Sequence, residues 1–333
     1  MCTFTANFST FELVNLFLRF MQIHYDINQL PVFKNAVVTI GTFDGVHEGH
    51  KKIIEQLTKT AQQAGGESVI VTFHPHPRKI VSSSILGIRL INTLSEKTEL
   101  LEQLGINHLV ITPFTEVFAN QEPEDYLKDF LIDKFHPHTI IIGYDHHFGK
   151  NRKGNYKLLE SCQEKYGYQL KEIPKHILDH IGISSTKIRE SILNGDTATT
   201  NHLLGYNFFF EGEVVHGDKL GRELGYPTAN LKVQNEEKIL PCDGIYAVYA
   251  SVKNIEGNYG PIFKGMMSIG FRPTVDGTKR VVEVNLFDFQ ADIYGKTLRV
   301  YVKQYLRSEE KFDSLEALVK KIDNDKEESL KVL

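Results

Sequence analysis

The apolar pattern of this 333-residue chain changes once, near Leu204, and this change limits the fold more than any other feature. Before that point, helix-like stretches alternate with four short runs that are apolar along their length: Ala36–Ile40, Ser68–Phe73, His108–Ile111 and Thr139–Ile142. Such runs are typical of parallel strands that are buried on both faces, with the helices as their cover. The first part therefore predicts an α/β domain that binds ligands beyond the carboxyl ends of its strands.

The expected helices include Lys51–Ala64 and Ser95–Leu104, and Ser95 is the predicted N-cap of the second. After residue 204 the chain has the pattern of short strands separated by turns: Phe208–Val215, Ile245–Val252, Ile262–Ile269, Arg280–Phe289 and Thr297–Val302. The first long helix-like segment after them is Ser314–Ile322. This order predicts an antiparallel barrel with a terminal helix, joined to the α/β domain near residues 194–205.

Composition and charge exclude several classes of protein. The chain is 41% hydrophobic and 24% charged with a net charge of −4, which is typical of globular proteins and does not favour nucleic acid or an anionic membrane as a partner. The cysteines (Cys2, Cys162 and Cys242) are odd in number and far apart, which favours reduced thiols in the cytoplasm. The apolar run 11–20 is too short to span a membrane, which takes about 20 residues.

A glycine-rich motif, residues 41–50, follows the first predicted strand directly. Its glycines, Gly41, Gly45 and Gly49, allow tight turns and a close approach of the backbone to a ligand. The helix that begins near Gly49 offers free N–H groups and a positive dipole end to an anion. His47 and His50 can face the same side and donate hydrogen bonds to phosphoryl oxygens. The motif therefore favours a triphosphate site.

Other interpretations of these histidines are open from the residues alone. Two histidines near a helix start can also be surface or capping residues with local hydrogen bonds. A zinc site does not fit, because His47 and His50 are three apart rather than in an H-E-x-x-H arrangement. His74 and His76 have no third ligand at metal spacing, and no P-loop sequence occurs anywhere in the chain.

The motif G-x-F-D-G-x-H-x-G-H resembles the nucleotide-binding motif of the bacterial bifunctional riboflavin kinase/FAD synthetases. Its H-x-G-H element alone is equally compatible with pantetheine-phosphate, nicotinamide-nucleotide and cytidylyl transferases. Further segments narrow the resemblance to the flavin family: 72–77, 114–119, 143–149 with Arg152 and Gly154, and 184–189. His146 departs from the family, which often has Phe there, and this bears on how the flavin stacks.

The resemblance implies roles for residues of the first domain. His47 and His50 are then catalytic. The residues that bind ATP and its phosphates are then Gly41, Phe43, Asp44, Gly49, Asp145, Arg152, Ser184, Ser185, Thr186 and Arg189.

The barrel half opens with a second glycine-rich segment, residues 212–230, whose backbone can wrap a polyphosphate without a P-loop. Thr228 and Asn230 are two apart and share a side if the chain is extended, and both are oxygen donors that Mg²⁺ accepts. In the strand 280–289, Glu283 points away from the face of Val282 and Val284. Glu283 is a candidate general base, although a glutamate on a polar strand face is often simply solvated.

The barrel half closely resembles the riboflavin kinase domain over the segments 212–230, 244–248, 268–275, 282–286 and 305–312. This resemblance implies that Thr228 and Asn230 hold Mg²⁺ with ATP and that Glu283 activates the ribityl 5′-hydroxyl. The implied ATP and flavin contacts are Gly212, Gly217, Arg222, Gly225, Pro227, Thr228 and Asn230.

We therefore expect an α/β parallel-sheet nucleotidyltransferase (Rossmann-like) domain over 21–195, followed by an antiparallel six-stranded flavokinase β-barrel with a C-terminal helix over 203–333. Residues 1–20 are expected to be a disordered extension or a mis-assigned start. The expected activities are phosphorylation of riboflavin to FMN and adenylylation of FMN to FAD, each with ATP and Mg²⁺. The rivals are a chain with kinase activity alone and a flavin-binding regulatory module. Monomer and transient homo-oligomer are both left open.

Overall fold

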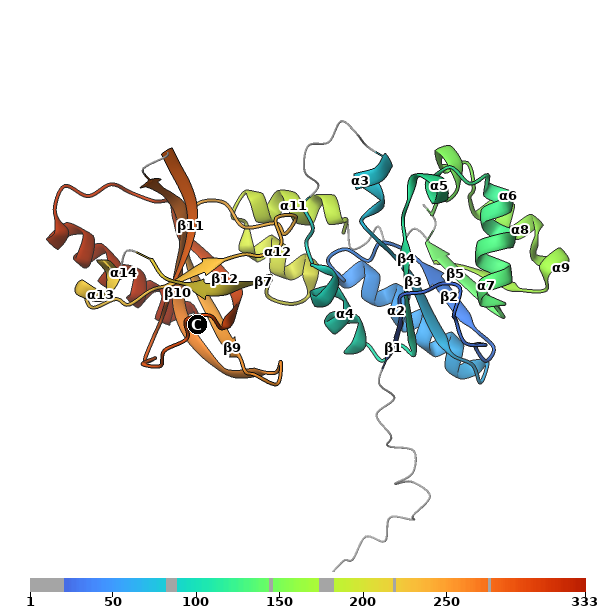
Figure 1. Cartoon of the computed structure of the whole chain (residues 1–333), viewed down its shortest axis with the longest axis horizontal. Coiled ribbons are helices and arrows are strands. Elements are labelled where there is room, and N and C mark those ends of the chain that lie inside the picture. Colours follow the sequence, from blue (N-terminus) through green and yellow to red (C-terminus); the bar gives the residue numbers. More distant parts are fainter. Residues whose placement is uncertain (1–20, 82–88, 144–145, 174–182, 218–219, 275–276) are drawn as a thin grey trace, which may run out of the picture. The chain divides into compact units, whose positions relative to one another are not determined.

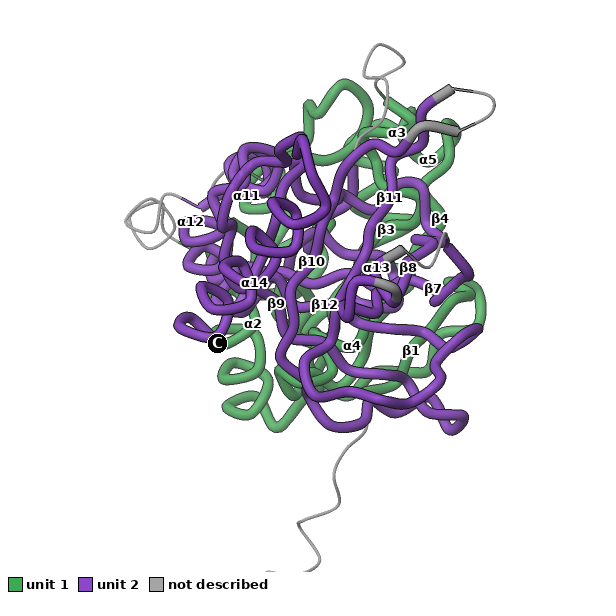
Figure 2. The backbone as a smooth tube through the Cα atoms, turned by 90° about the vertical axis from the view of Figure 1, so that its left-hand side faces the viewer, with its two compact units in different colours: residues 1–42, 52–81, 98–174 green, residues 43–51, 82–97, 175–333 purple. Residues whose placement is uncertain are grey.

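The computed structural model describes residues 21–81, 89–143, 146–173, 183–217, 220–274 and 277–333, so the extension 1–20 and Asp145 lie outside the described residues. The chain forms two compact units (Figure 2). The first unit contains residues 1–42, 52–81 and 98–174, and the second contains residues 43–51, 82–97 and 175–333. Each unit is therefore assembled from separate stretches of the sequence.

A six-stranded parallel sheet forms the centre of the first unit, in the order β1-β4-β3-β2-β5-β6 (Figure 1). The strands are β1 (Gln22–His24), β2 (Val37–Ile40), β3 (Ser68–His74), β4 (His108–Pro113), β5 (Thr139–Gly143) and β6 (Gln169–Ile173). The four predicted strands are the four central ones. The edge strands β1 and β6 were not predicted because they are short and largely exposed, so they lack the continuous apolar signal.

Helices and short turns connect these strands. They are α2 (Glu48–Gln63), α3 (Pro77–Val81), α4 (Leu94–Glu102), α5 (Glu116–Ala119), α6 (Pro123–Asp125), η1 (Tyr126–Ile132), α7 (Asp133–Phe135), η2 (Lys150–Arg152), α8 (Tyr156–Ser161) and α9 (Gln163–Tyr166). Both helices expected from the sequence, α2 and α4, are present.

The predicted N-cap of α4 was wrong, because the helix begins one residue before Ser95. The Glu96 N–H donates to Thr93 Oγ1 at 3.3 Å, and the Thr93 N–H donates to the Glu96 carboxylate at 2.8 Å. These reciprocal bonds form a capping box, in which a Ser or Thr N-cap pairs with a Glu three residues later. Thr93 is therefore the N-cap. Glu96 lies three residues after Thr93, as a capping box requires, but only one residue after Ser95.

The second unit contains a closed antiparallel barrel in the order β10-β11-β8-β7-β12-β9, as expected. Its strands are β7 (Phe209–Val215), β8 (Ala229–Lys232), β9 (Gly244–Lys253), β10 (Tyr259–Thr274), β11 (Gly277–Leu286) and β12 (Thr297–Arg307). The sixth strand, β8, was not recognised because it has only 4 residues. The helices of this unit are α11 (Ser185–Leu193), α12 (Thr197–Leu204), α13 (Leu220–Glu223) and α14 (Leu315–Val332).

The interior of the barrel follows the alternation expected for β11. Val282, Val284 and Leu286 are buried in the core, whereas Glu283 is only partly buried. The terminal helix α14 begins after Ser314, which accepts a hydrogen bond from the Ala317 N–H at 3.2 Å, and it is longer than the sequence pattern indicated. The alternation of β11 therefore puts Glu283 on the outer face of the barrel wall.

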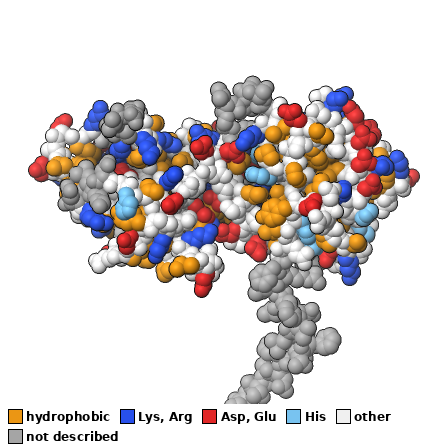
Figure 3. All heavy atoms as spheres, viewed as in Figure 1, with side chains coloured by type: hydrophobic (Ala, Val, Ile, Leu, Met, Phe, Trp, Pro, Cys, Tyr) orange, Lys and Arg blue, Asp and Glu red, His pale blue; other side chains and the backbone are white. Residues whose placement is uncertain are grey.

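The surface carries charges of both signs. Figure 3 shows Lys and Arg side chains interspersed with Asp and Glu on the face in view, as the small net charge predicts. Within the described ranges, no helix combines the length and the apolar character that crossing a bilayer requires. Cys162 and Cys242 are both free thiols.

Candidate active sites

The loop between β2 and α2 has an unusual backbone. Phe43 and Val46 adopt left-handed φ angles of 49° and 37°, and Gly45 between them has φ of 92°. A non-glycine residue in this region costs about 1–3 kcal/mol, so the surrounding contacts must hold it there. Phe43 and Val46 are both almost fully buried, and a Cβ on Gly45 would stand 3.2 Å from the Ile91 side chain. The loop is therefore fixed by packing on both sides of Gly45.

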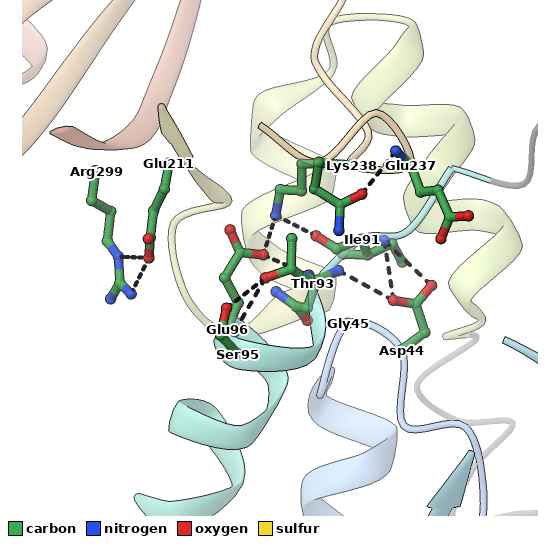
Figure 4. Close-up of polar contacts among 12 residues, drawn as sticks. Asp44, Gly45, Ile91, Thr93, Ser95, Glu96, Glu211, Glu237, Lys238 and Arg299 are labelled. Carbon is green, nitrogen blue, oxygen red and sulfur yellow. Dashed lines mark hydrogen bonds and ion pairs between the residues drawn. The ribbon is translucent and has the colours of Figure 1, made fainter. Parts of the chain in front are cut away.

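Asp44 is the polar anchor of this loop. Its side chain is buried, and its carboxylate accepts hydrogen bonds from the N–H groups of Ile91 at 3.0 Å and Asn92 at 3.2 Å (Figure 4). It also forms an ion pair with Arg189 of α11, and the Asp44 carbonyl accepts a bond from Ser185 Oγ at 3.0 Å. Arg189 in addition donates to the Arg89 carbonyl at 2.7 Å. These contacts tie together three segments that are distant in sequence.

The two motif histidines stack on each other at the first turn of α2. Their ring centroids are 3.6 Å apart with an interplanar angle of 13°, and the His50 N–H donates to Nδ1 of His47 at 3.3 Å. A Cβ on Gly49 would stand 3.2 Å from the His47 ring, which explains a residue without a side chain there. The expectation that both rings face the same side is confirmed.

Burial keeps both histidines neutral at pH 7. It lowers the pKa of His47 from 6.5 to about 4, although the nearby Asp44 carboxylate opposes the shift. Burial also lowers the pKa of His50 well below 6.5, and the neighbouring His47 adds to this effect. A neutral imidazole still offers one N–H donor. Among the residues that the structure describes, His50 Nδ1 is buried without a hydrogen-bond partner.

The segment 184–189, expected from the sequence to contact phosphate, lies at the start of α11. Ser184 is the N-cap and accepts a hydrogen bond from the Lys187 N–H at 3.2 Å, Ser185 holds the Asp44 carbonyl, and Thr186 is exposed. The structure therefore brings residues 184–189 together with the 43–50 loop. Gly41 and the exposed Arg152 belong to the first unit, and nothing in that unit assigns them a ligand.

Three residues beside this loop were missed from the sequence. The Tyr206 hydroxyl donates to the Gly45 carbonyl at 2.6 Å and to the Asn92 side chain at 3.2 Å. The amide nitrogen of Asn92 is buried and, within the described part of the chain, has no partner. Lys97 is buried, and burial lowers its pKa to about 8 against the attraction of Asp44. No local motif marks these residues, because the chain brings them to the loop only on folding.

The barrel carries a small, solvent-open pocket. It is lined by Gly217, Arg222, Pro227, Thr228, Asn230 and Tyr294, of which only Tyr294 was not expected. A Cβ on Gly217 would stand 2.2 Å from the Asn230 amide nitrogen, so this glycine makes room for that side chain. Thr228 and Asn230 therefore open onto the same pocket, as their spacing predicted.

Two glycines of the same segment have conformational roles. A Cβ on Gly212 would press within 3.0 Å of Leu231 on the neighbouring strand β8. Gly225 has φ of 84° and ends the turn before the pocket. Neither residue lines the pocket, and their predicted contacts with ATP or flavin stay predictions.

Glu283 lies at the centre of a small polar cluster. In the barrel wall it pairs with Asn230 of β8 on one side and with Ser268 of β10 on the other. Its side chain is 26% exposed, and its carboxylate accepts a hydrogen bond from Arg272 Nη2 at 3.0 Å. Arg272 Nη1 also binds Glu309 at 2.8 Å. Glu283 is therefore an oriented carboxylate next to Asn230 rather than a freely solvated one.

Comparison with known proteins gives matches for both halves. A family model described as FAD synthetase matches residues 30–187, and one described as riboflavin kinase matches residues 204–333. A bifunctional riboflavin kinase/FMN adenylyltransferase of Bacillus subtilis is 36% identical over 300 residues, 89% of this chain and 92% of the relative. The enzyme of the same description from Haemophilus influenzae is 33% identical over 90% of this chain and 95% of its own length.

A solved structure agrees in fold over nearly the same extent. A Streptococcus pneumoniae protein described as a macrolide-efflux protein superimposes with a TM-score of 0.79 at 29% identity, covering 92% of this chain and 98% of that one. The curated relatives and the family models agree with each other on two flavin activities. Because both models match and these relatives span about nine-tenths of the chain, it belongs to the family of bifunctional riboflavin kinase/FMN adenylyltransferases.

Proposed function

We propose that the barrel pocket phosphorylates riboflavin to FMN and that the loop of residues 43–50 adenylylates FMN to FAD. The observation that carries this proposal is that one chain holds both sets of side chains: stacked His47 and His50 at a helix start, and Glu283 in register with Asn230 beside the pocket. Membership of the bifunctional family supports the same pair of reactions. ATP is the second substrate of each.

In the adenylylation step, a phosphate oxygen of FMN attacks the α-phosphorus of ATP and pyrophosphate leaves. His47 and His50 donate hydrogen bonds to the phosphoryl oxygens as negative charge develops, and the N-terminus of α2 adds the positive end of its dipole. The buried, unpartnered Nδ1 of His50 supports this role, because such an atom is costly unless a ligand satisfies it. Asp44 and Arg189 neutralise each other, so they hold the loop while the histidines meet the phosphates.

In the kinase step, the ribityl 5′-hydroxyl of riboflavin attacks the γ-phosphorus of ATP and ADP leaves. Glu283 accepts the hydroxyl proton as the new P–O bond forms. Arg272 orients this carboxylate through the bond at 3.0 Å. Arg222 lines the pocket, and its positive charge supports a role in binding the phosphates of ATP. Neither reaction requires a covalent intermediate on the protein, so positioning and electrostatics provide the catalysis.

The residues beside the barrel pocket fit a Mg²⁺ ion that arrives with ATP. Thr228 and Asn230 provide neutral oxygen donors, and Gly217 leaves the space in which the Asn230 side chain stands. Across the described ranges, no cluster of three or more His, Cys, Asp or Glu residues could hold a metal by itself. This suits Mg²⁺, which takes one or two protein ligands together with phosphates and waters. When bound, the ion would neutralise charge on the transferred phosphoryl group.

One assay tests the proposed function. The full chain is incubated with labelled riboflavin, ATP and Mg²⁺, and FMN and FAD are separated over time. We expect FMN to appear first and FAD to follow from it. FMN without FAD would leave only the kinase, and the absence of both products would leave a flavin-binding module.

A further inference from the structure

A short backbone pairing within the second unit joins the segment next to Asp44 to a loop of the barrel. Leu90 and Lys238 form a parallel bridge: the Leu90 N–H donates to the Glu237 carbonyl at 2.6 Å, and the Ile239 N–H donates to the Leu90 carbonyl at 2.9 Å. The next N–H along, that of Ile91, is one of the two that hold Asp44. The barrel loop around Lys238 therefore binds Leu90, the residue directly before Ile91, and the Ile91 N–H in turn binds Asp44 in the loop of residues 43–50.

Lys238 fixes this junction through its side chain (Figure 4). Its ammonium group donates to the Ile91 carbonyl and to the Glu96 carboxylate, both at 2.6 Å. The two side chains are 1% and 2% exposed, and the same carboxylate accepts the Thr93 N–H in the capping box of α4. One buried cation thus holds both ends of the segment 91–96, whose first two N–H groups bind Asp44.

Stability alone does not explain a charge pair at this depth. Removing two ions from water costs several kcal/mol each, and a well-packed apolar pair is often as stable or more stable. The best-attested use of such pairs is to fix one arrangement among several. Here the arrangement includes the direction of the Ile91 and Asn92 N–H groups. Lys238 does not line the barrel pocket, so the kinase reaction does not account for it.

We propose that Lys238, a residue of the riboflavin kinase region, is a positioning residue for FAD formation. It holds Ile91 and Glu96, which set the amides that bind Asp44, and Asp44 sets the loop that carries His47 and His50. This inference rests on the proposed role of the two histidines. It makes one activity of the chain depend on a side chain from the region that carries the other.

The test uses the full-length double variant Lys238→Met/Glu96→Gln, which removes both charges while Gln keeps the capping box. The kcat of FAD formation from supplied FMN and ATP should fall about 10–100-fold, because a displacement of reactive groups by about 1 Å can lower a rate by about 100-fold. The KM for ATP and the kinase activity should not change. Lys238→Arg, which retains the donors, should keep most of the FAD formation.

An independent readout is the ionisation of His47, followed by NMR. A loosened loop admits water, so the pKa of His47 should rise from about 4 toward its ordinary value of 6.5 in the double variant. Wild-type kcat for FAD formation in the double variant would overturn the proposal. An equal fall in both activities would also overturn it, because it would mean a general loss of folded enzyme.

Arg299→Met is the matched control. Arg299 is also a buried barrel cation with a carboxylate partner, Glu211, and both Arg299 and Lys238 lie against the Phe209 ring, at 4.5 and 5.5 Å. The Arg299 guanidinium is paired with Glu211 of β7, so the ratio of the two activities and the His47 pKa should stay as in wild type in this variant. The role of the histidines is tested separately: wild-type FAD formation in His47→Ala would refute that role, whereas wild-type FAD formation in Lys238→Met/Glu96→Gln refutes only the role of Lys238.

Discussion

The two candidate sites hold their reactive side chains in different ways. His47 and His50 lie on a buried loop with left-handed residues, and contacts from residues 91–92, 185–189 and 206 keep it in place. Glu283 lies on a regular strand of a closed barrel, where the register alone puts it beside Asn230. The loop site therefore depends on side-chain contacts with an irregular loop, whereas the barrel site depends mainly on the register of regular strands. Mutations that change one site should therefore leave the activity of the other site largely unchanged.

The largest effect is expected at the barrel site. Glu283→Gln keeps the shape of the side chain but cannot accept a proton, so the kinase kcat should fall by about 10²–10⁴-fold. Riboflavin and ATP should bind nearly as before, and supplied FMN should still become FAD. Steady-state kinetics of both reactions on this one variant measure the effect. A kinase with undiminished kcat would mean that another group is the base.

The next effect is at the loop site. His47→Ala/His50→Ala removes two donors to the phosphoryl oxygens, so FAD formation should fall by about 100-fold or more. FMN formation should be unchanged, because the barrel wall does not use these side chains. The two rates are measured on the same preparation. Loss of both activities together would show that the two reactions do not depend on separate sets of side chains.

A smaller effect should follow from crowding the barrel pocket. In Gly217→Ala the new Cβ would stand 2.2 Å from the Asn230 amide nitrogen, so that side chain must move. The kinase should lose about 10-fold in kcat/KM for ATP as its nucleotide contact is displaced. Gly260→Ala is the control, because the nearest atom to its Cβ would be at 3.5 Å. Equal kinetics in the two variants would count against Asn230 as a nucleotide ligand.

The smallest effect concerns stability and pH. The pKa of His47 is about 4 in the folded chain against 6.5 when unfolded, so between these values the unfolded chain binds a proton that the folded one does not. The free energy of unfolding should therefore be full above pH 6.5 and fall by up to about 1.4 kcal/mol per pH unit as the pH drops toward 4. Urea unfolding of wild type and His47→Gln at pH 7 and 5 measures this. An equal change in the free energy of unfolding between pH 7 and pH 5 in the two proteins would contradict this prediction.

The same contrast explains what could be predicted from the sequence. The central strands, the barrel and the inward face of β11 follow from apolar patterns a few residues long, so they were predicted closely. The shared orientation of His47 and His50 was predicted from their spacing at the start of α2. Edge strand β6 and the short strand β8 carry too little apolar signal to be found.

The contacts of Asp44 could not be predicted, because its partners come from segments far along the chain. The D-G pair in the motif indicates a tight turn, but nothing local indicates that a carboxylate there binds two amide groups and Arg189. The N-cap of α4 is an intermediate case. The spacing of Thr93 and Glu96 matches a capping box, and weighing it would have corrected the choice of Ser95.

The pairing of Leu90 with Lys238 also bears on recombination between homologous genes. A crossover between the two regions matched by the family models, within residues 190–203, preserves every motif of both active sites. It nevertheless takes the strand-like segment 89–92 from one parent and the loop 235–239 from the other. A chimaera is therefore expected to keep its parental kinase rate and to make FAD well only if both parents supply the same junction, including the lysine and its glutamate.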